Sequence, residues 1–222
     1  ALTILESVYY TLSEKAEGRI SKVNVPCLVS ESCKSSATLV GCGLGVCDAT
    51  LNIVFSFIEN STTPLVLDAD ALNCVAKQPE ILLRKKAPII ITPHPGEMSR
   101  LTGLATPLVN AERQRVALDF AQKYGVVTVL KGAGTVIASP NGKVLVNPTG
   151  NSGMATGGSG DVLAGMTASI LAQGASAFSS AAAAVYLHGL AGDIAAEKYG
   201  KISMLPTDLI NCIPLAYKRC GF

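Results

Sequence analysis

Several signatures that would identify a function directly are missing from this sequence. No Gly-x-x-x-x-Gly-Lys-[Ser/Thr] segment occurs, which excludes a P-loop, and no Gly-x-Ser-x-Gly segment occurs, which excludes the nucleophile elbow of serine hydrolases. Charged residues are only 15% of the 222 residues, and the net charge is +2. Without a basic stripe, neither nucleic acid nor a membrane surface is expected as the main partner. A small-molecule partner is therefore favoured.

Histidines are few, and the cysteines do not have the spacing of a metal site. Only two histidines occur, and the seven cysteines show no Cys-x-x-Cys spacing, so a structural zinc site is not expected. Scattered cysteines in an odd number indicate reduced thiols in a reducing compartment. The N-terminus shows no basic start followed by an apolar run, so no signal peptide is visible and we expect a cytoplasmic location. Polar residues interrupt the Ala-rich stretch at 162–196, which favours packed helices over a membrane span.

The apolar pattern predicts an α/β fold. Hydrophobic residues are 49% of the chain and mean hydropathy is +0.39, which is typical of parallel strands covered on both faces. Residues 1–36 show little periodicity and are expected to be connecting structure. The expected strands are 38–41, 64–68, 88–92 and 126–130, followed by a hairpin of 136–139 and 143–146 around Asn141-Gly142. The expected helices are 46–58, a segment through Leu101, 110–124, 161–173, 176–199 and 206–217.

The chain is organised around a glycine-rich stretch at 147–165, which leads into an Ala/Leu-rich helix. Glycines allow consecutive amides to converge, and the first amides of a helix have no partner inside the helix. Phosphate is the natural ligand of such a loop. Asp161 lies at the start of the predicted helix, where its carboxylate can serve as a catalytic base or as an N-cap. Position alone leaves both roles open.

Other candidate residues follow the predicted strands, at the edge where open α/β sheets bind ligands. Gly43 and Gly45 follow the first strand and form either a partial dinucleotide motif or, more simply, a tight turn. Asp68 and Asp70 follow the second strand and can hold Mg²⁺ through water or cap the next helix.

The third and fourth strands supply a histidine and a lysine. His94 lies between two prolines after the third strand, and it either meets the substrate or is simply solvated. Lys131 follows the fourth strand, where its ammonium can meet phosphates or remain an ordinary surface charge.

Taken together, these segments resemble the ribokinase-like superfamily, and within it the ADP-dependent NAD(P)H-hydrate dehydratases. The resemblance is carried by four segments in this order: Val-Leu-Asp-Ala-Asp-Ala-Leu-Asn at 66–73, Thr-Pro-His-Pro-Gly-Glu at 92–97, Lys-Gly-Ala-Gly-Thr at 131–135, and 151–161. It runs from about Leu39 to the C-terminus. The implied fold is a three-layer sandwich with a mostly parallel sheet, helices on both faces and an edge β-hairpin, forming one domain over 1–222. The family's preceding strand-helix unit and epimerase domain have no counterpart that we identify in this sequence.

The resemblance implies repair of hydrated nicotinamide cofactors. The ring hydroxyl of the S epimer of hydrated NADH or NADPH (NADHX, NADPHX) is phosphorylated by ADP, and loss of phosphate yields NADH or NADPH, AMP and phosphate. Asp161 is implied as the base, with Mg²⁺ on the phosphates and Gly43, Gly45 and His94 facing the hydrated nucleotide. The implied adenine-nucleotide residues are Lys131, Gly132, Ala133, Gly134, Thr135, Asn151, Ser152, Gly153, Met154, Ala155, Thr156, Gly157, Gly158, Ser159 and Gly160. A homotetramer is expected from the same resemblance.

Three points stay open at this level. ADP and ATP present the same phosphates to one loop, so the donor is not decided, and neither is the choice between NADHX and NADPHX. A small-molecule kinase of the same superfamily, acting on a vitamin precursor or sugar, is an alternative. A truncated, non-catalytic nucleotide-binding module is another.

Overall fold

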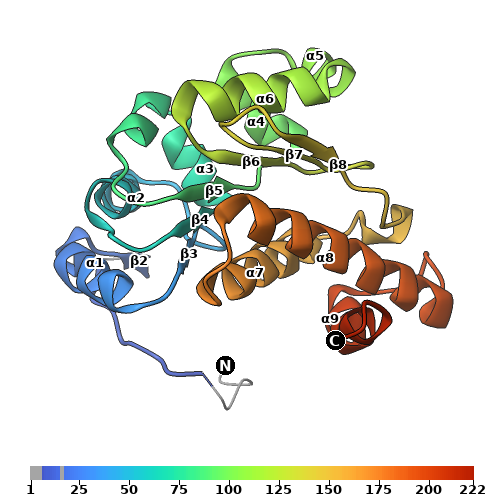
Figure 1. Cartoon of the computed structure of the whole chain (residues 1–222). Coiled ribbons are helices and arrows are strands. Elements are labelled where there is room, and N and C mark those ends of the chain that lie inside the picture. Colours follow the sequence, from blue (N-terminus) through green and yellow to red (C-terminus); the bar gives the residue numbers. More distant parts are fainter. Residues whose placement is uncertain (1–6, 16–17) are drawn as a thin grey trace.

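The computed structural model describes residues 7–15 and 18–222 and has an α/β architecture of three layers (Figure 1). In this part of the chain, a six-stranded sheet has the order β3-β4-β5-β6-β7-β8. The first four strands are parallel, and β7 and β8 continue the sheet antiparallel. The predicted mostly parallel sheet with an edge hairpin is confirmed.

The strands are short and lie within the predicted segments. Their bounds are β3 Thr38–Val40, β4 Leu65–Leu67, β5 Ile89–Ile91, β6 Val127–Leu130, β7 Val136–Ala138 and β8 Val144–Val146. Parallel register places Leu65 beside Ile89 and Leu67 beside Ile91. The carboxyl ends of β3 to β6 therefore meet at one edge of the sheet.

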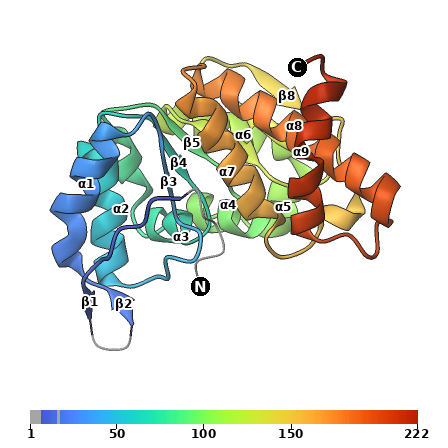
Figure 2. The same ribbon diagram turned by 90° about the horizontal axis from the view of Figure 1, so that it is seen from below.

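Helices cover both faces. The helices described are α1 Val25–Lys34, α2 Asp48–Asn60, α3 Asp70–Val75, α4 Pro95–Thr102, α5 Thr106–Ala111, α6 Arg113–Tyr124, α7 Ser159–Ala172, α8 Ala177–Tyr199 and α9 Pro206–Arg219, with 3₁₀ turns η1 Lys22–Asn24, η2 Pro79–Arg84 and η3 Ser152–Met154. Figure 1 shows α4 and α6 above the sheet, α2 to the left of β4 and β5, and α7, α8 and α9 below the sheet. Buried residues of α2, α3, α4 and α6 belong to one core, and those of α7, α8 and α9 to the other. Figure 2, from below, shows α7 beneath the sheet, with α8 and α9 beside it.

The two cores follow from the alternation of side chains along each strand. Leu65 and Leu67 of β4 point into the core shared with α2, α3 and α6, whereas Val66 points into the core shared with α7, α8 and α9. All three of these side chains are essentially fully buried. Since both faces need apolar side chains, the strands appear in the sequence as continuous apolar runs.

The prediction that 1–36 is only connecting structure is wrong for the residues that the structure describes. Val25–Lys34 forms α1, and β1 Glu14–Lys15 pairs antiparallel with β2 Arg19–Ile20. Proline is typical of loops, but Pro26 lies in the first turn of α1, where a missing amide hydrogen costs no helical bond. Residues 1–6, 16 and 17, which the same prediction included, lie outside the described residues.

Two other helices differ from their predicted bounds. The segment expected as one helix at 110–124 is divided at Glu112, whose backbone lies at φ −123° and ψ 39°, outside the helical region. The helix expected at 161 begins at Ser159, so part of the glycine stretch is already helical. No helix in the described part of the chain combines the length and the apolar character needed to cross a bilayer.

Candidate functional site

The glycine-rich stretch ends in the N-terminus of α7 with its amides available to a ligand. Gly158 takes φ +94° at the N-cap and offers no capping side chain, so the prediction of Asp161 as an N-cap is wrong. Asp161 lies in the first turn, and its side chain is exposed. Among the described residues, the amides of Gly160 and Asp161 donate no backbone hydrogen bond. Free amides at a helix N-terminus form an anion site, and Asp161 lies beside it.

Helix α8 holds the beginning of this stretch in place. Asp193 accepts hydrogen bonds from the Gly150 amide at 2.9 Å and from Asn151 Nδ2 at 3.0 Å. Thr149 Oγ1 donates to the Tyr186 carbonyl at 2.9 Å. A Cβ on Gly189 would lie 2.1 Å from Thr149 Oγ1, so the loop contacts the helix backbone. These contacts hold residues 149–151 against α8.

His188 holds the other end of the loop. Its Nε2 lies 3.0 Å from the Ser159 carbonyl in the first turn of α7. Burial lowers the pKa of His188 to about 4, so the ring is neutral near pH 7. Nε2 must then carry the hydrogen that it donates to the carbonyl. This histidine is therefore a structural donor under the site.

A buried ion pair lies between the ends of β4 and β6. Lys131 Nζ lies 2.6 Å from Asp68 Oδ1, and the side chains are 18% and 1% exposed. Lys131 Nζ also lies 3.9 Å from Glu97 Oε2. Burial raises the pKa of Glu97, while the nearby Lys131 ammonium opposes that shift. The interpretation of Lys131 as an ordinary surface lysine is wrong, and Asp68 binds this ammonium in place of capping α3.

Three groups on different elements converge in front of this pair. The Cys42 Sγ and one carboxylate oxygen each from Asp68 and Asp161 lie within 4.8 Å of one another. Cys42 Sγ lies 3.9 Å from Asp68 Oδ2. Cys42 is exposed as a residue, but partial burial of its thiol, helped by the nearby Asp161 and Asp68 carboxylates, raises the pKa of the thiol to about 12. The thiol is therefore protonated and donates to Asp68. The oxygens of Asp68 and Asp161 suit a hard cation such as Mg²⁺, whereas the soft sulfur of Cys42 does not.

His94 caps α4, a role that neither sequence interpretation included. Its Nδ1 accepts from the amides of Gly96 at 3.0 Å and Glu97 at 3.4 Å, and Glu97 Oε2 accepts from the His94 amide at 2.8 Å. This reciprocal arrangement is a capping box. Because Nδ1 accepts, Nε2 carries the hydrogen of a neutral ring, and the side chain remains 51% exposed at the sheet edge. His94 can therefore cap the helix and still present a donor.

The turn after β3 confirms the predicted need for glycine. Gly43 and Gly45 have φ of +68° and +74°, which are costly for residues with a Cβ. The Gly45 amide donates to Asp70 Oδ2 at 2.8 Å, so Asp70 fixes this turn. The structure thus brings the turn after β3, His94, Lys131 and the glycine loop to one sheet edge.

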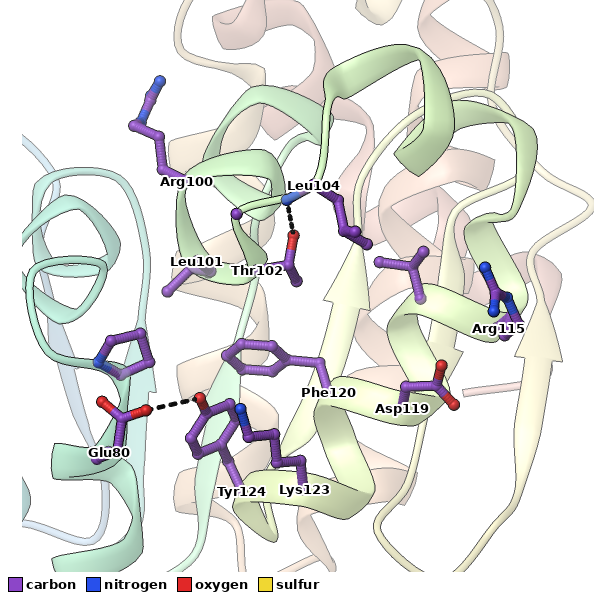
Figure 3. A pocket seen from close by; sticks show the side chains of 13 residues that line it. Glu80, Arg100, Leu101, Thr102, Leu104, Arg115, Asp119, Phe120, Lys123 and Tyr124 are labelled. Atoms are coloured by element: carbon purple, nitrogen blue, oxygen red, sulfur yellow. Dashed lines mark hydrogen bonds between the residues drawn. The ribbon is translucent and has the colours of Figure 1, made fainter.

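Two pockets formed by the described residues do not coincide with this edge. One, of about 550 Å³, lies between α4, α6 and η2 and has Leu101, Phe120 and Tyr124 in its lining (Figure 3). None of the predicted site residues lines it. The second, of about 450 Å³, runs along β3 and α1 and reaches Gly41, Cys42 and Leu44. It touches only the β3 side of the candidate site.

Sequence reasoning missed several residues that shape the site. Cys42 was noted as a scattered thiol, yet its place between Gly41 and Gly43 after a predicted strand was a usable signal. Glu97 three residues after His94 has the spacing of a capping box, but histidine is an unusual cap. Asp193 and His188 belong to a distant helix, and no local pattern links them to the loop.

Comparisons with known proteins agree on one family. The family model described as NAD(P)H-hydrate dehydratase matches residues 9–215, so the similarity begins well before Leu39, where the sequence analysis placed it. A bifunctional NAD(P)H-hydrate repair enzyme of Thermofilum pendens is 42% identical over 213 residues, which are 96% of this chain and 41% of that protein. An ADP-dependent (S)-NAD(P)H-hydrate dehydratase of Neisseria meningitidis is 42% identical over 168 residues, 74% of this chain and 57% of that protein.

Solved structures give the same result. An ADP/ATP-dependent NAD(P)H-hydrate dehydratase of Bacillus subtilis, co-crystallised with ATP and Mg²⁺, superposes with a TM-score of 0.76 and 32% identity, over 86% of this chain and 69% of that one. A hydroxyethylthiazole kinase protein of Pyrococcus horikoshii superposes with a TM-score of 0.67 at 19% identity over 84% of this chain and 74% of that one, which shows a shared fold. This chain spans about two fifths of the bifunctional relatives' length.

Proposed function

This chain belongs to the NAD(P)H-hydrate dehydratase family, and from that premise we propose that it repairs hydrated NADH and NADPH with an adenine nucleotide as phosphoryl donor. The observation that carries the proposal is the exposed Asp161 in the first turn of α7, next to amides free to bind a phosphoryl group. An anion site and a base side by side are what transfer of a phosphoryl group to a hydroxyl requires.

Two loops would hold the nucleotide. We assign this role to Lys131, Gly132, Ala133, Gly134 and Thr135, and to the stretch from Asn151 through Ser152, Gly153, Met154, Ala155, Thr156, Gly157, Gly158 and Ser159 to Gly160. Support comes from their common place at the sheet edge and from the exposure of residues 155–158. The amides of Gly158 and Gly160 would stabilise charge on the transferring phosphoryl group, whereas the Ser159 amide between them donates to the Thr156 carbonyl at 3.3 Å.

The hydrated nicotinamide ring would lie across from the nucleotide, against Gly43, Gly45 and His94. Asp161 would take the proton of the ring hydroxyl. The hydroxyl oxygen would at the same time attack the β-phosphorus of ADP, and AMP would leave. The ring nitrogen lone pair would then expel phosphate, and loss of a proton from the neighbouring ring carbon would restore the dihydropyridine. Phosphate is a far better leaving group than hydroxide, which explains why a phosphoryl donor is needed.

Mg²⁺ fits this site through oxygen donors. Asp68 would hold it through water beside the phosphates, and its chemistry would be to neutralise the charge of the phosphate oxygens. The Cys42 sulfur is not assigned this role, because sulfur is a soft ligand and Mg²⁺ prefers oxygen. Asp161 stays available for the hydroxyl proton.

We also propose that the protein assembles as a homotetramer. Leu145 and Val146 on β8 are 47% and 48% exposed, and Ile210 and Leu215 on α9 are 48% and 47% exposed. Exposed apolar side chains on an edge strand and on an outer helix favour self-association. Light scattering after size exclusion tests this directly, with a mass near four chains expected and a monomer contradicting it.

The stoichiometry of products tests the proposed reaction. The chain is incubated with hydrated NADH, Mg²⁺ and ADP, and NADH, AMP and inorganic phosphate are quantified together. We expect the three products to rise in equal amounts. A phosphorylated product that accumulates without NADH would contradict dehydration and indicate a small-molecule kinase.

A further inference from the structure

Arg113, at the start of α6, is a half-buried cation that the proposed reaction does not use. Its Nη2 donates to the carbonyl of Leu130, the last residue of β6, at 2.8 Å. Burial lowers the pKa of its guanidinium. None of the ion pairs formed by the described residues includes Arg113, whereas Arg115 on the same helix pairs with Glu112. A partly desolvated guanidinium without a carboxylate partner needs an explanation.

The guanidinium lies against the backbone of the 131–135 loop. Gly132 has φ +145°, and a Cβ there would lie 2.9 Å from Arg113 Nη1 and 3.0 Å from Nη2. The space beside Gly132 is therefore filled by Arg113. On the far side of the loop, Thr135 Oγ1 donates to the Gly132 carbonyl at 3.0 Å. Backbone bonds also hold the two ends of the loop, because the Lys131 amide donates to the Pro93 carbonyl at 2.8 Å and the Asn147 amide donates to the Thr135 carbonyl at 2.9 Å. Arg113 adds a contact from α6 at Gly132.

We propose that Arg113 is a positioning residue for adenine-nucleotide binding, acting through Leu130 and Gly132; this inference rests on the proposed function. It fixes the first peptides of the loop in the shape that the nucleotide meets. A loop that is already ordered loses less conformational freedom on binding, so its affinity is higher. The unpaired positive charge near the loop also favours an anionic ligand.

The test measures ADP dissociation constants by calorimetry for wild type, Arg113→Lys and Arg113→Ala, well below their unfolding temperatures. We expect Arg113→Ala to bind ADP about tenfold more weakly, with a raised KM for ADP and a smaller change in kcat. Arg113→Lys, which keeps charge and a donor, should fall between the two. Arg115→Ala, on the exposed side of α6, is the matched control and should bind like wild type. Phe120→Leu controls for a general loss of helix stability, and it should lower the unfolding temperature without weakening ADP binding.

A double-mutant cycle with Gly132→Ala tests the contact itself. In wild type the added methyl meets the guanidinium and also strains the backbone, whereas in the Arg113→Ala background only the strain remains. We therefore expect Gly132→Ala to weaken ADP binding severalfold less in that background. Equal losses in both backgrounds overturn the proposal. Wild-type ADP affinity in both Arg113 variants also overturns the proposal. If circular dichroism shows that Arg113→Ala is unfolded, the affinity of Arg113→Lys alone decides. Failure of wild type to bind ADP would instead overturn the proposed function, and this inference with it.

Discussion

Replacing Lys131 with methionine should strongly destabilise the fold. The ammonium lies 2.6 Å from Asp68 Oδ1, and the Asp68 side chain is only 1% exposed. Without Lys131, this carboxylate keeps one weak donor, the Cys42 thiol at 3.9 Å, and it lies close to the carboxylate of Asp161. At 1% exposure, too little water reaches this carboxylate to compensate for the lost ammonium.

The size of the effect follows from the burial. Removing one partner of a buried ion pair costs about 3–5 kcal/mol, because the other charge remains uncompensated. Replacing both partners, as in Asp68→Asn with Lys131→Met, should cost less than the single change, since no buried charge is left. A typical domain has a free energy of unfolding of only about 5–15 kcal/mol, so the single substitution is readily measured.

Urea unfolding followed by circular dichroism supplies the assay. We expect a large drop in the urea midpoint for Lys131→Met and partial recovery in the double variant. Arg219→Met removes an exposed pair with Glu197 and should leave the midpoint unchanged. A wild-type midpoint for Lys131→Met, or a double variant less stable than the single one, would refute the reasoning.

Three further predictions follow from the structure. Burial lowers the pKa of His188 from 6.5 to about 4 in the folded state. The neutral ring therefore contributes up to roughly 3 kcal/mol of stability above pH 6.5, and this contribution is lost as the pH falls toward 4. In His188→Gln, the free energy of unfolding should depend less on pH across that range. Gly189→Ala should weaken nucleotide binding in calorimetry, because its methyl would displace the glycine loop, whereas Gly165→Ala meets no atom within 4 Å in a helix and should raise the melting temperature. The pKa of Cys47 is lowered by the Thr50 amide whereas that of Cys42 is raised to about 12, so iodoacetamide should label Cys47 faster in a mass-spectrometric time course, and the opposite order would contradict the assigned contacts.

Much of the fold was predictable because each central strand needs apolar side chains on both faces. A strand covered on both faces needs apolar residues at every position, and the runs at 65–67 and 89–91 carry that signal without help from distant residues. The hairpin was predictable from Asn141-Gly142 for the same local reason. Helix α1 was missed because its start includes Pro26, which is ambiguous between a loop and a first helical turn.

The site was predictable where backbone geometry limits the choice of residue, and not where it depends on tertiary contacts. The backbone has positive φ at positions 43 and 45, and the glycines that such angles favour are visible in the sequence. The bond of Lys131 to Asp68 joins the ends of two strands that are not adjacent in the sheet, and local periodicity says nothing about it. The contact of Arg113 with Gly132 is likewise formed only when α6 packs beside the end of β6.

The central claim, that this chain restores hydrated cofactor with Asp161 as the base, has one direct measurement. Hydrated NADH is incubated with the chain, Mg²⁺ and ADP, and the reduced-nicotinamide absorbance band is followed, with Asp161→Asn in parallel and ADP binding of both proteins checked by calorimetry. We predict recovery of the band by wild type and loss of that recovery by several orders of magnitude in the variant, while both bind ADP. No recovery by wild type with either ADP or ATP, or equal recovery by Asp161→Asn, would contradict the account.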